Sequence, residues 1–201
     1  GLCLVGSEMC IRDSLNIVDL AGGTGDIGFR FLKKFPKNNF VSIIDINHEM
    51  LKEGEKISAK INLSKSCNFI CSQGENISLA DNYADILTIS FGIRNVSNRQ
   101  KCLKECFRIL KPGGIFICME FSLPNDIVLR NLYDAWSYGL IPKFGKLIVG
   151  EEGPYKYLVD SIRTFPNPEE FNDMIMEAGF KKTIIRQLTG NIVCIYRAEK
   201  I

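Results

Sequence analysis

The chain has 201 residues, of which 46% are hydrophobic and 24% are charged. These values fit one globular domain, or one domain with an insertion, and they exclude disordered and collagen-like chains. The 25 Lys and Arg residues nearly balance the 23 Asp and Glu residues, so no bulk positive charge is available to hold a nucleic acid.

The first fourteen residues differ from the rest of the chain. Residues 1–14 start with Gly1 and lack the basic start and small-residue cleavage site of a signal peptide. We interpret them as a non-native segment, because they resemble the translated end of a sequencing-library adapter; a genuine N-terminal strand or helix is the alternative. The functional argument therefore uses residues 15–201, and we expect a native N-terminal segment to be missing.

From Asn16 onward, short β-rich runs alternate with helical patterns, which predicts an open parallel sheet with crossover helices. The expected strands are Asn16–Leu20, Phe40–Asp45, Asn68–Ser72, Ala84–Ser90 and Ile115–Phe121. The expected helices are Asp26–Phe35, His48–Ile61 and Asn98–Leu110. We expect Ser97 to cap the last of these helices, with Gln100 completing a capping box, and Lys111-Pro112-Gly113-Gly114 to stop it.

Residues 123–166 interrupt this alternation. The apolar side chains there either pack as a pair of core helices or form a wall over a substrate, and we predict a substrate-covering insertion. A helix then follows the cap Asn167 and ends at Gly179. Two strands, Lys182–Leu188 and Asn191–Arg197, flank a gap so short that they must run antiparallel.

The strongest local signal is the run from Ile17 to Asp26, in which a buried strand leads into a glycine-rich turn and then a helix. Glycine lets the backbone approach a ligand closely, and the start of a helix offers free N–H groups. Residues 23–28 also fit the G-x-G-x-x-G pattern of dinucleotide-binding enzymes. An NAD-dependent oxidoreductase is therefore an alternative at this point.

Asp45 ends the second predicted strand, twenty residues after Gly25. A carboxylate there can accept both hydroxyls of a ribose, each bond contributing about 1.5–3 kcal/mol. The alternative role is a helix cap, for which Asn47 is better placed. Asp19 and Asp26 flank the turn, which disfavours a pyrophosphate and suits the cationic ligand S-adenosylmethionine. The antiparallel C-terminal hairpin is likewise typical of the seven-stranded methyltransferase sheet.

Several motifs together resemble one family. They resemble the ubiquinone/menaquinone biosynthesis C-methyltransferases with even spacing from about residue 16 to 201. The glycine-rich turn and Lys-Pro-Gly-Gly are shared by many class I methyltransferases, whereas Ser90-Phe91-Gly92-Ile93-Arg94-Asn95 is far more specific. The matching runs are Asp19–Asp26, Ser90–Val96, Leu110–Gly114, Glu120–Ser122, Tyr157–Pro166 and Glu177–Phe180.

The resemblance implies an α/β fold: a doubly wound, mostly parallel seven-stranded class I methyltransferase sheet with an antiparallel last strand. It implies S-adenosyl-L-methionine as the cofactor, held at the carboxyl ends of strands. Gln73-Gly74 departs from the family's more usual acidic residue or Asn followed by Ala, although Gln can still accept from an adenine amino group. The implied cofactor-binding residues are Gly23, Thr24, Asp45, Gln73, Gly74 and Ser90.

The implied reaction transfers a methyl group to a ring carbon of a polyprenylated benzoquinol or demethylmenaquinol. Arg94 is expected to stabilise the developing ring oxyanion or to orient a water, and Asn95 to hold the quinol oxygen. A salt-bridged helix entry is the alternative role of Arg94. Glu120 is expected to face the cleft as a second-choice acid–base group, and His48 to be structural. Family members also carry an N-terminal segment that covers the substrate, so the present chain is expected to need it for activity.

The partner expected from the resemblance is a polyprenylated quinol, with no nucleic acid. No apolar run approaches the ~20 residues of a membrane-spanning helix, so we expect a cytoplasmic protein with at most weak peripheral contact to the inner membrane through Lys143 and Lys146. A homodimer or a quinone-biosynthesis complex is expected from relatives. The eight cysteines lack the spacing of a zinc site, so no metal is predicted. A methyltransferase for another small molecule and a non-catalytic scaffold are further alternatives.

Overall fold

A computed structural model describes residues 14–36, 38–124, 130 and 153–201. The segment predicted to be non-native, except Ser14, lies outside the described residues. Most of the predicted insertion, including Lys143 and Lys146, also lies outside them. None of the described helices is both long and apolar enough to cross a bilayer.

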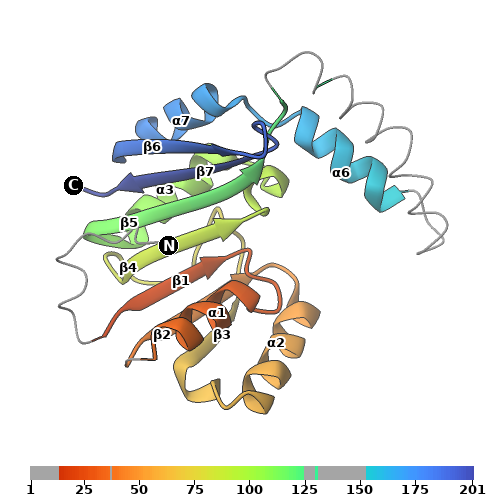
Figure 1. Ribbon diagram of the computed structural model, residues 1–201. Coiled ribbons are helices and arrows are strands. Elements are labelled where there is room, and N and C mark those ends of the chain that lie inside the picture. Colours follow the sequence, from red (N-terminus) through yellow and green to blue (C-terminus); the bar gives the residue numbers. More distant parts are fainter. Residues whose placement is uncertain (1–13, 37, 125–129, 131–152) are drawn as a thin grey trace.

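The core of the molecule is a seven-stranded sheet with the order β3-β2-β1-β4-β5-β7-β6 (Figure 1). Every neighbouring pair is parallel except β5–β7 and β6–β7, so β7 is the antiparallel strand. The predicted doubly wound sheet is therefore confirmed. The strands are β1 (Asn16–Leu20), β2 (Phe40–Asp45), β3 (Cys67–Cys71), β4 (Ala84–Ser90), β5 (Leu110–Phe121), β6 (Lys181–Leu188) and β7 (Val193–Glu199).

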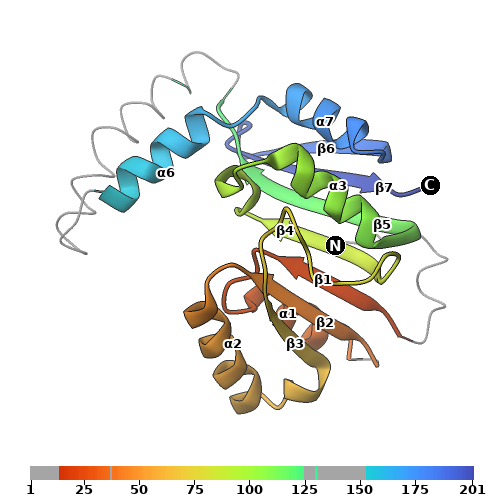
Figure 2. The ribbon, with the colours of Figure 1, turned by 180° about the vertical axis from the view of Figure 1, so that it is seen from behind.

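Helices cover the sheet on both faces, and each face has its own apolar core. One core joins the buried sides of α1 and α2 to β1 and β2; the other joins α3 and α7 to β4, β5 and β7. Figure 2 shows α3 and α7 in front of the sheet and α1 behind it. The helices are α1 (Asp26–Lys34), α2 (His48–Lys60), α3 (Arg99–Ile109), α6 (Gly153–Arg163) and α7 (Pro168–Glu177), with short 3-10 turns η2 (Ser64–Ser66) and η3 (Ile93–Asn95).

The cap of α3 differs from the prediction. The side-chain oxygen of Asn98, not that of Ser97, accepts the N–H of Lys101 at 2.9 Å. Gln100 does not complete a capping box either, because its amide donates to the carbonyl of Met174 on α7. Ser97 and Asn98 are both good caps, and the helix begins one residue later than the choice of Ser97 required.

The start of β5 also differs from the prediction. The Lys-Pro-Gly-Gly run does follow the end of α3 at Ile109, as expected, but the strand begins at Leu110 and not at Ile115, so the run belongs to the strand. A register shift between Ala84 and Ile86 of β4 accommodates the run, and Gly113 takes the left-handed φ of 77°. Backbone bonds from Gly113 to Lys200 and from Lys200 to Gly114 then fix this irregular start against the end of the chain.

The start of α7 follows the prediction closely. The side chain of Asn167 accepts the N–H of Glu170 at 2.9 Å, and the Glu170 carboxylate accepts the N–H of Asn167 at 3.0 Å. Pro168 occupies the first turn, where its missing N–H costs nothing. The capping box thus defines the start of α7, and the helix packs against β6 and β7.

Candidate active site

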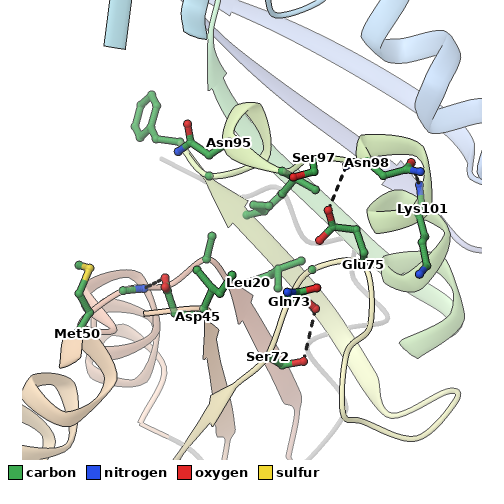
Figure 3. Close-up of a pocket in the computed structure, with 18 residues that line it drawn as sticks. Leu20, Asp45, Met50, Ser72, Gln73, Glu75, Asn95, Ser97, Asn98 and Lys101 are labelled. Atoms are coloured by element: carbon green, nitrogen blue, oxygen red, sulfur yellow. Dashed lines mark hydrogen bonds between the residues drawn. The ribbon is translucent and has the colours of Figure 1, made fainter. Parts of the chain in front are cut away.

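A cavity of about 730 Å³ opens at the carboxyl ends of β1 to β4 (Figure 3). Its size lies within the range of small-molecule sites, and its place is where this class of sheet binds ligands. Side chains from the strand ends and from the segments after them line it. Those used below are Gly23, Asp45, Met50, Gln73, Gly74 and Asn95.

The glycines of the turn between β1 and α1 have different structural roles. Gly23 and Gly25 have left-handed backbones, with φ of 56° and 87°, which side chains disfavour. A Cβ at Gly28 would lie 2.8 Å from Val41, so core packing explains that glycine. A Cβ at Gly23 would meet only the flexible end of Met50. Gly23 is therefore the glycine of the motif that opens onto the cavity.

Asp19 lies buried beneath this turn. Its Oδ2 accepts the N–H of Gly28 at 3.2 Å, and its Oδ1 accepts the hydroxyl of Thr88 at 3.0 Å. Burial raises the pKa of Asp19 to about 6, although both hydrogen bonds oppose the shift. Asp19 thus supports the turn from below and does not line the cavity.

Asp45, at the end of β2, joins two loops at the cavity wall. Its Oδ2 accepts the N–H of Gly23 at 2.9 Å, and its Oδ1 accepts the N–H of Asn47 at 2.8 Å. Asn47 itself caps α2, as expected, by accepting the N–H groups of Glu49 and Met50. Each carboxylate oxygen of Asp45 can accept a second hydrogen bond, so this half-buried side chain can still receive two hydroxyl groups.

The segment after β3 forms the next part of the wall. Gln73 and Gly74 both line the cavity, and their contact with a cofactor stays a prediction. A Cβ at Gly74 would lie 2.9 Å from the sulfur of Cys102 on α3, which explains why a glycine follows Gln73 here. Glu75 completes the turn by accepting the N–H of Asn98 at 3.1 Å, and so ties this wall to the start of α3.

Two residues predicted to bind the cofactor do not line the cavity. Thr24 packs toward α2, where a Cβ at Gly54 would lie 2.8 Å from the Thr24 carbonyl oxygen. Ser90 ends β4 beside Met119, while its neighbours Ile89 and Phe91 reach the cavity. Contact of Thr24 and Ser90 with a cofactor stays a prediction.

Arg94 forms a buried ion pair beside the cavity. Its Nη1 lies 2.8 Å from Oε1 of Glu120, and its side chain is only 11% exposed. The same guanidinium donates to the carbonyl of Phe91 and lies over the ring of Phe121. The salt-bridged alternative for Arg94 is thus present in the structure. If Arg94 acts in catalysis, its guanidinium does so while paired with Glu120.

Glu120 was expected to face the cleft, and that prediction is wrong. Its side chain is completely buried, and it accepts the N–H groups of Arg94 and Phe121 as well as the guanidinium. Burial raises the pKa of Glu120, while the positive charge of Arg94 opposes the shift. The strand alternation places Glu120 on the α3 and α7 face of β5, together with Phe116 and Cys118.

Asn95 lines the cavity, and its contact with a substrate stays a prediction. It ends the 3-10 turn η3 directly after β4. The hydroxyl of Tyr157, from α6, donates to its Oδ1 at 3.1 Å. The sequence motif around Arg94 located this position, but no sequence pattern linked it to Tyr157.

Sequence analysis missed several lining residues. Ile46 and Met50 follow Asp45 and present 67% and 42% of their surface to solvent, although both are large and apolar. Apolar residues at exposed positions just after a strand-end carboxylate were the available signal. Lys101 also lines the cavity, and only the correct cap of α3 would have placed it there.

The model of the ubiE/COQ5 methyltransferase family matches residues 4–200 of the chain. The chain belongs to this family. The match begins inside residues 1–14, whose non-native origin stays a prediction. Membership in a methyltransferase family decides between the two nucleotide-binding classes that the glycine-rich turn left open. The NAD-dependent oxidoreductase alternative is therefore no longer supported.

Curated members of the ubiE/COQ5 methyltransferase family match most of the chain. A protein of Bartonella bacilliformis named ubiquinone/menaquinone biosynthesis C-methyltransferase UbiE is 44% identical over 185 residues, which are 92% of this chain and 71% of that protein. A protein of the same name from Rickettsia bellii is 43% identical over 189 residues, covering 92% of this chain and 76% of that protein.

Solved structures support the fold of this family member independently. A structure described as a SAM dependent methyltransferase from Aquifex aeolicus superposes with a TM-score of 0.65 at 18% identity. The superposition covers 93% of this chain and 82% of that one. At this identity the likeness concerns the fold alone.

Proposed function

We propose that this chain methylates a ring carbon of a polyprenylated benzoquinol or demethylmenaquinol, with S-adenosyl-L-methionine as the methyl donor. The observation that carries the proposal is identity of 42 to 44% with proteins named as quinone-biosynthesis C-methyltransferases over more than nine-tenths of the chain. The cavity adds support, because Asp45, Gln73 and Asn95, from the residues predicted for the nucleoside and for the acceptor, all line it.

The donor set of the cavity fits the proposed cofactor. Asp45 offers two carboxylate oxygens to ribose hydroxyls, and the bare backbone of Gly23 leaves space beside it. Gln73 offers an amide to the base, while Ile46 and Met50 provide apolar surface next to Asp45. When bound, S-adenosylmethionine supplies a methyl group on a positively charged sulfur.

The acceptor side of the cavity would act on a ring oxygen. The ring carbon becomes nucleophilic as negative charge develops on a neighbouring hydroxyl, so groups that stabilise this oxygen favour the reaction. Asn95 can donate its amide N–H to that oxygen. Arg94, next in the chain, would contribute positive charge or orient a water; its pKa is too high for it to act as a base.

We further propose that the protein works in the cytoplasm with weak peripheral contact to the inner membrane. The support is the chemistry of the substrate: a polyprenyl tail partitions into lipid, so the ring must be taken up at a membrane surface. A homodimer or a quinone-biosynthesis complex belongs to the same proposal. Co-sedimentation with anionic lipid vesicles and light scattering test these two points.

The reaction is tested by supplying both quinol classes and measuring the methylated products by mass spectrometry. Binding of S-adenosylhomocysteine and of NADH is measured in parallel by calorimetry. The proposal requires S-adenosylhomocysteine binding and one methylated quinol. Binding without turnover on either quinol in the full-length protein would instead support a scaffold or another small-molecule acceptor.

A further inference from the structure

Asn95 is contacted by a helix that is distant in sequence. It ends the turn η3, and α6 packs against this turn. Tyr157 of α6 lies 62 positions further along the chain, and its hydroxyl donates to Oδ1 of Asn95 at 3.1 Å. One side chain of the cavity wall is therefore held from outside the cavity.

This hydrogen bond determines what Asn95 can offer to a ligand. An amide has an acceptor oxygen at one end and a two-hydrogen donor at the other, and its terminal torsion is roughly two-fold. In the structure the phenolic hydroxyl of Tyr157 donates to Oδ1, so this oxygen lies toward α6. In Figure 3 this oxygen points away from Asp45 and Met50, which lie on the other side of the cavity. The amide N–H groups of Asn95 are then available to a ligand in the cavity.

The orientation matters because negative charge develops on the substrate oxygen in the proposed reaction. An N–H group directed at that oxygen stabilises the charge, whereas a carbonyl oxygen in the same place would repel it. A freely rotating Asn95 would present the wrong end part of the time. We propose that Tyr157 is a positioning residue that holds Asn95 as a hydrogen-bond donor toward the acceptor oxygen of the substrate. This inference rests on the proposed function.

Tyr157 is poorly explained as a packing residue. Its side chain is 59% exposed, whereas Val159 and Ile162 on the same helix are each 4% exposed and anchor α6 to the body of the protein. Removing only the hydroxyl therefore leaves the packing of α6 in place. The substitution Tyr157→Phe keeps the ring and tests the hydrogen bond alone.

The experiment compares Tyr157→Phe, Asn95→Ala and the double variant in the full-length protein. We expect Tyr157→Phe to lower kcat for quinol methylation about 3- to 10-fold, with the affinity for S-adenosylhomocysteine unchanged. In the Asn95→Ala background the same substitution should lower kcat no further, because its target is gone. Asp160→Asn, at an exposed position of the same helix, is the control and should keep the wild-type kcat.

A second measurement does not depend on turnover. The side-chain amide resonance of Asn95 in a nitrogen-15 spectrum, assigned by its loss in Asn95→Asp, should shift in Tyr157→Phe and stay in place in Asp160→Asn. An unshifted resonance, or an equal loss of kcat with and without Asn95, overturns the inference. If the wild type binds S-adenosylhomocysteine but methylates no quinol, the proposed function fails instead, and the resonance still decides whether Tyr157 holds Asn95.

Discussion

Two buried carboxylates support the two sides of the cavity, and they are compensated in different ways. Asp19, beneath the glycine-rich turn, receives one backbone N–H and the hydroxyl of Thr88 within the described part of the chain. Glu120, beneath the acceptor side, receives a guanidinium and two backbone N–H groups. Burial raises the pKa of both, but only Glu120 has a cation that opposes it. Removing the charge of Glu120 should therefore destabilise the protein, whereas removing the charge of Asp19 should not.

The largest effect is expected at Glu120. Glu120→Ala leaves the guanidinium of Arg94 nearly buried and without its anion, which should destabilise the fold by about 3–5 kcal/mol. Urea unfolding at pH 7 measures this change. The matched control is Asp26→Ala, which breaks the exposed pair of Asp26 and Arg30 and should cost less than about 1 kcal/mol. Equal effects of the two variants would show that the buried pair contributes no more than a surface one.

The next effect is a pH dependence caused by Asp19. Its pKa is about 6 in the folded protein against 3.8 in the unfolded chain, so between these values the folded state holds the proton more strongly. Stability from this group is complete below pH 3.8 and is lost as the pH rises to about 6. The loss amounts to about 3 kcal/mol at 1.36 kcal/mol per pKa unit.

Asp19→Asn removes this titration and keeps the hydrogen bonds. Its oxygen can accept from Gly28, and its nitrogen can donate to the hydroxyl of Thr88, which is also within 3.4 Å of the Val18 carbonyl. We expect the variant to equal or exceed the wild type in stability at pH 7, to gain on it between pH 4 and about 6, and to keep that gain up to pH 7. Urea titrations at four pH values give this difference. A constant difference across the series contradicts the assignment.

A smaller effect, on binding, is expected at Asp45. Asp45→Asn retains the size of the side chain but replaces one charged acceptor oxygen by an amide nitrogen. Affinity for S-adenosylhomocysteine should fall about 10- to 100-fold, the range of one charge-assisted hydrogen bond. Calorimetry measures it, with Asp26→Asn as the control, because Asp26 is a nearby carboxylate at the start of α1 that does not line the cavity. An unchanged affinity would remove Asp45 from the proposed ribose site.

The regular elements could be predicted from the sequence where local pattern and packing agree. β1, β2 and β4 have the predicted bounds, because each is a short run rich in buried apolar residues. The start of β5 was missed because a proline and two glycines indicate a break locally, whereas pairing with Ala84 and Lys200 is a long-range effect. Local chemistry cannot show such a partner.

In the candidate site, too, local sequence pattern could be predicted whereas long-range contacts could not. Gly23, Asp45, Gln73 and Asn95 could be located from the sequence, because each lies at the carboxyl end of a predicted strand or within five residues after it. The burial of Glu120 could not be, since it depends on which face of β5 the helices α3 and α7 cover. The contact of Tyr157 with Asn95 likewise requires the packing of α6. Position along a strand was predictable, but the partners of each side chain were not.

The smallest predicted effect tests the corrected start of α3, which closes the cavity beside Gln73. Asn98→Ala removes the acceptor of the Lys101 N–H and should cost about 1 kcal/mol, the usual contribution of a helix cap. Ser97→Ala, one residue earlier, should change the stability by less than a third of that, because the helix does not use its hydroxyl as a cap. Thermal unfolding of both variants decides between them. A larger loss in Ser97→Ala would restore the cap that the sequence pattern predicted, and with it an α3 that begins one residue earlier at the cavity.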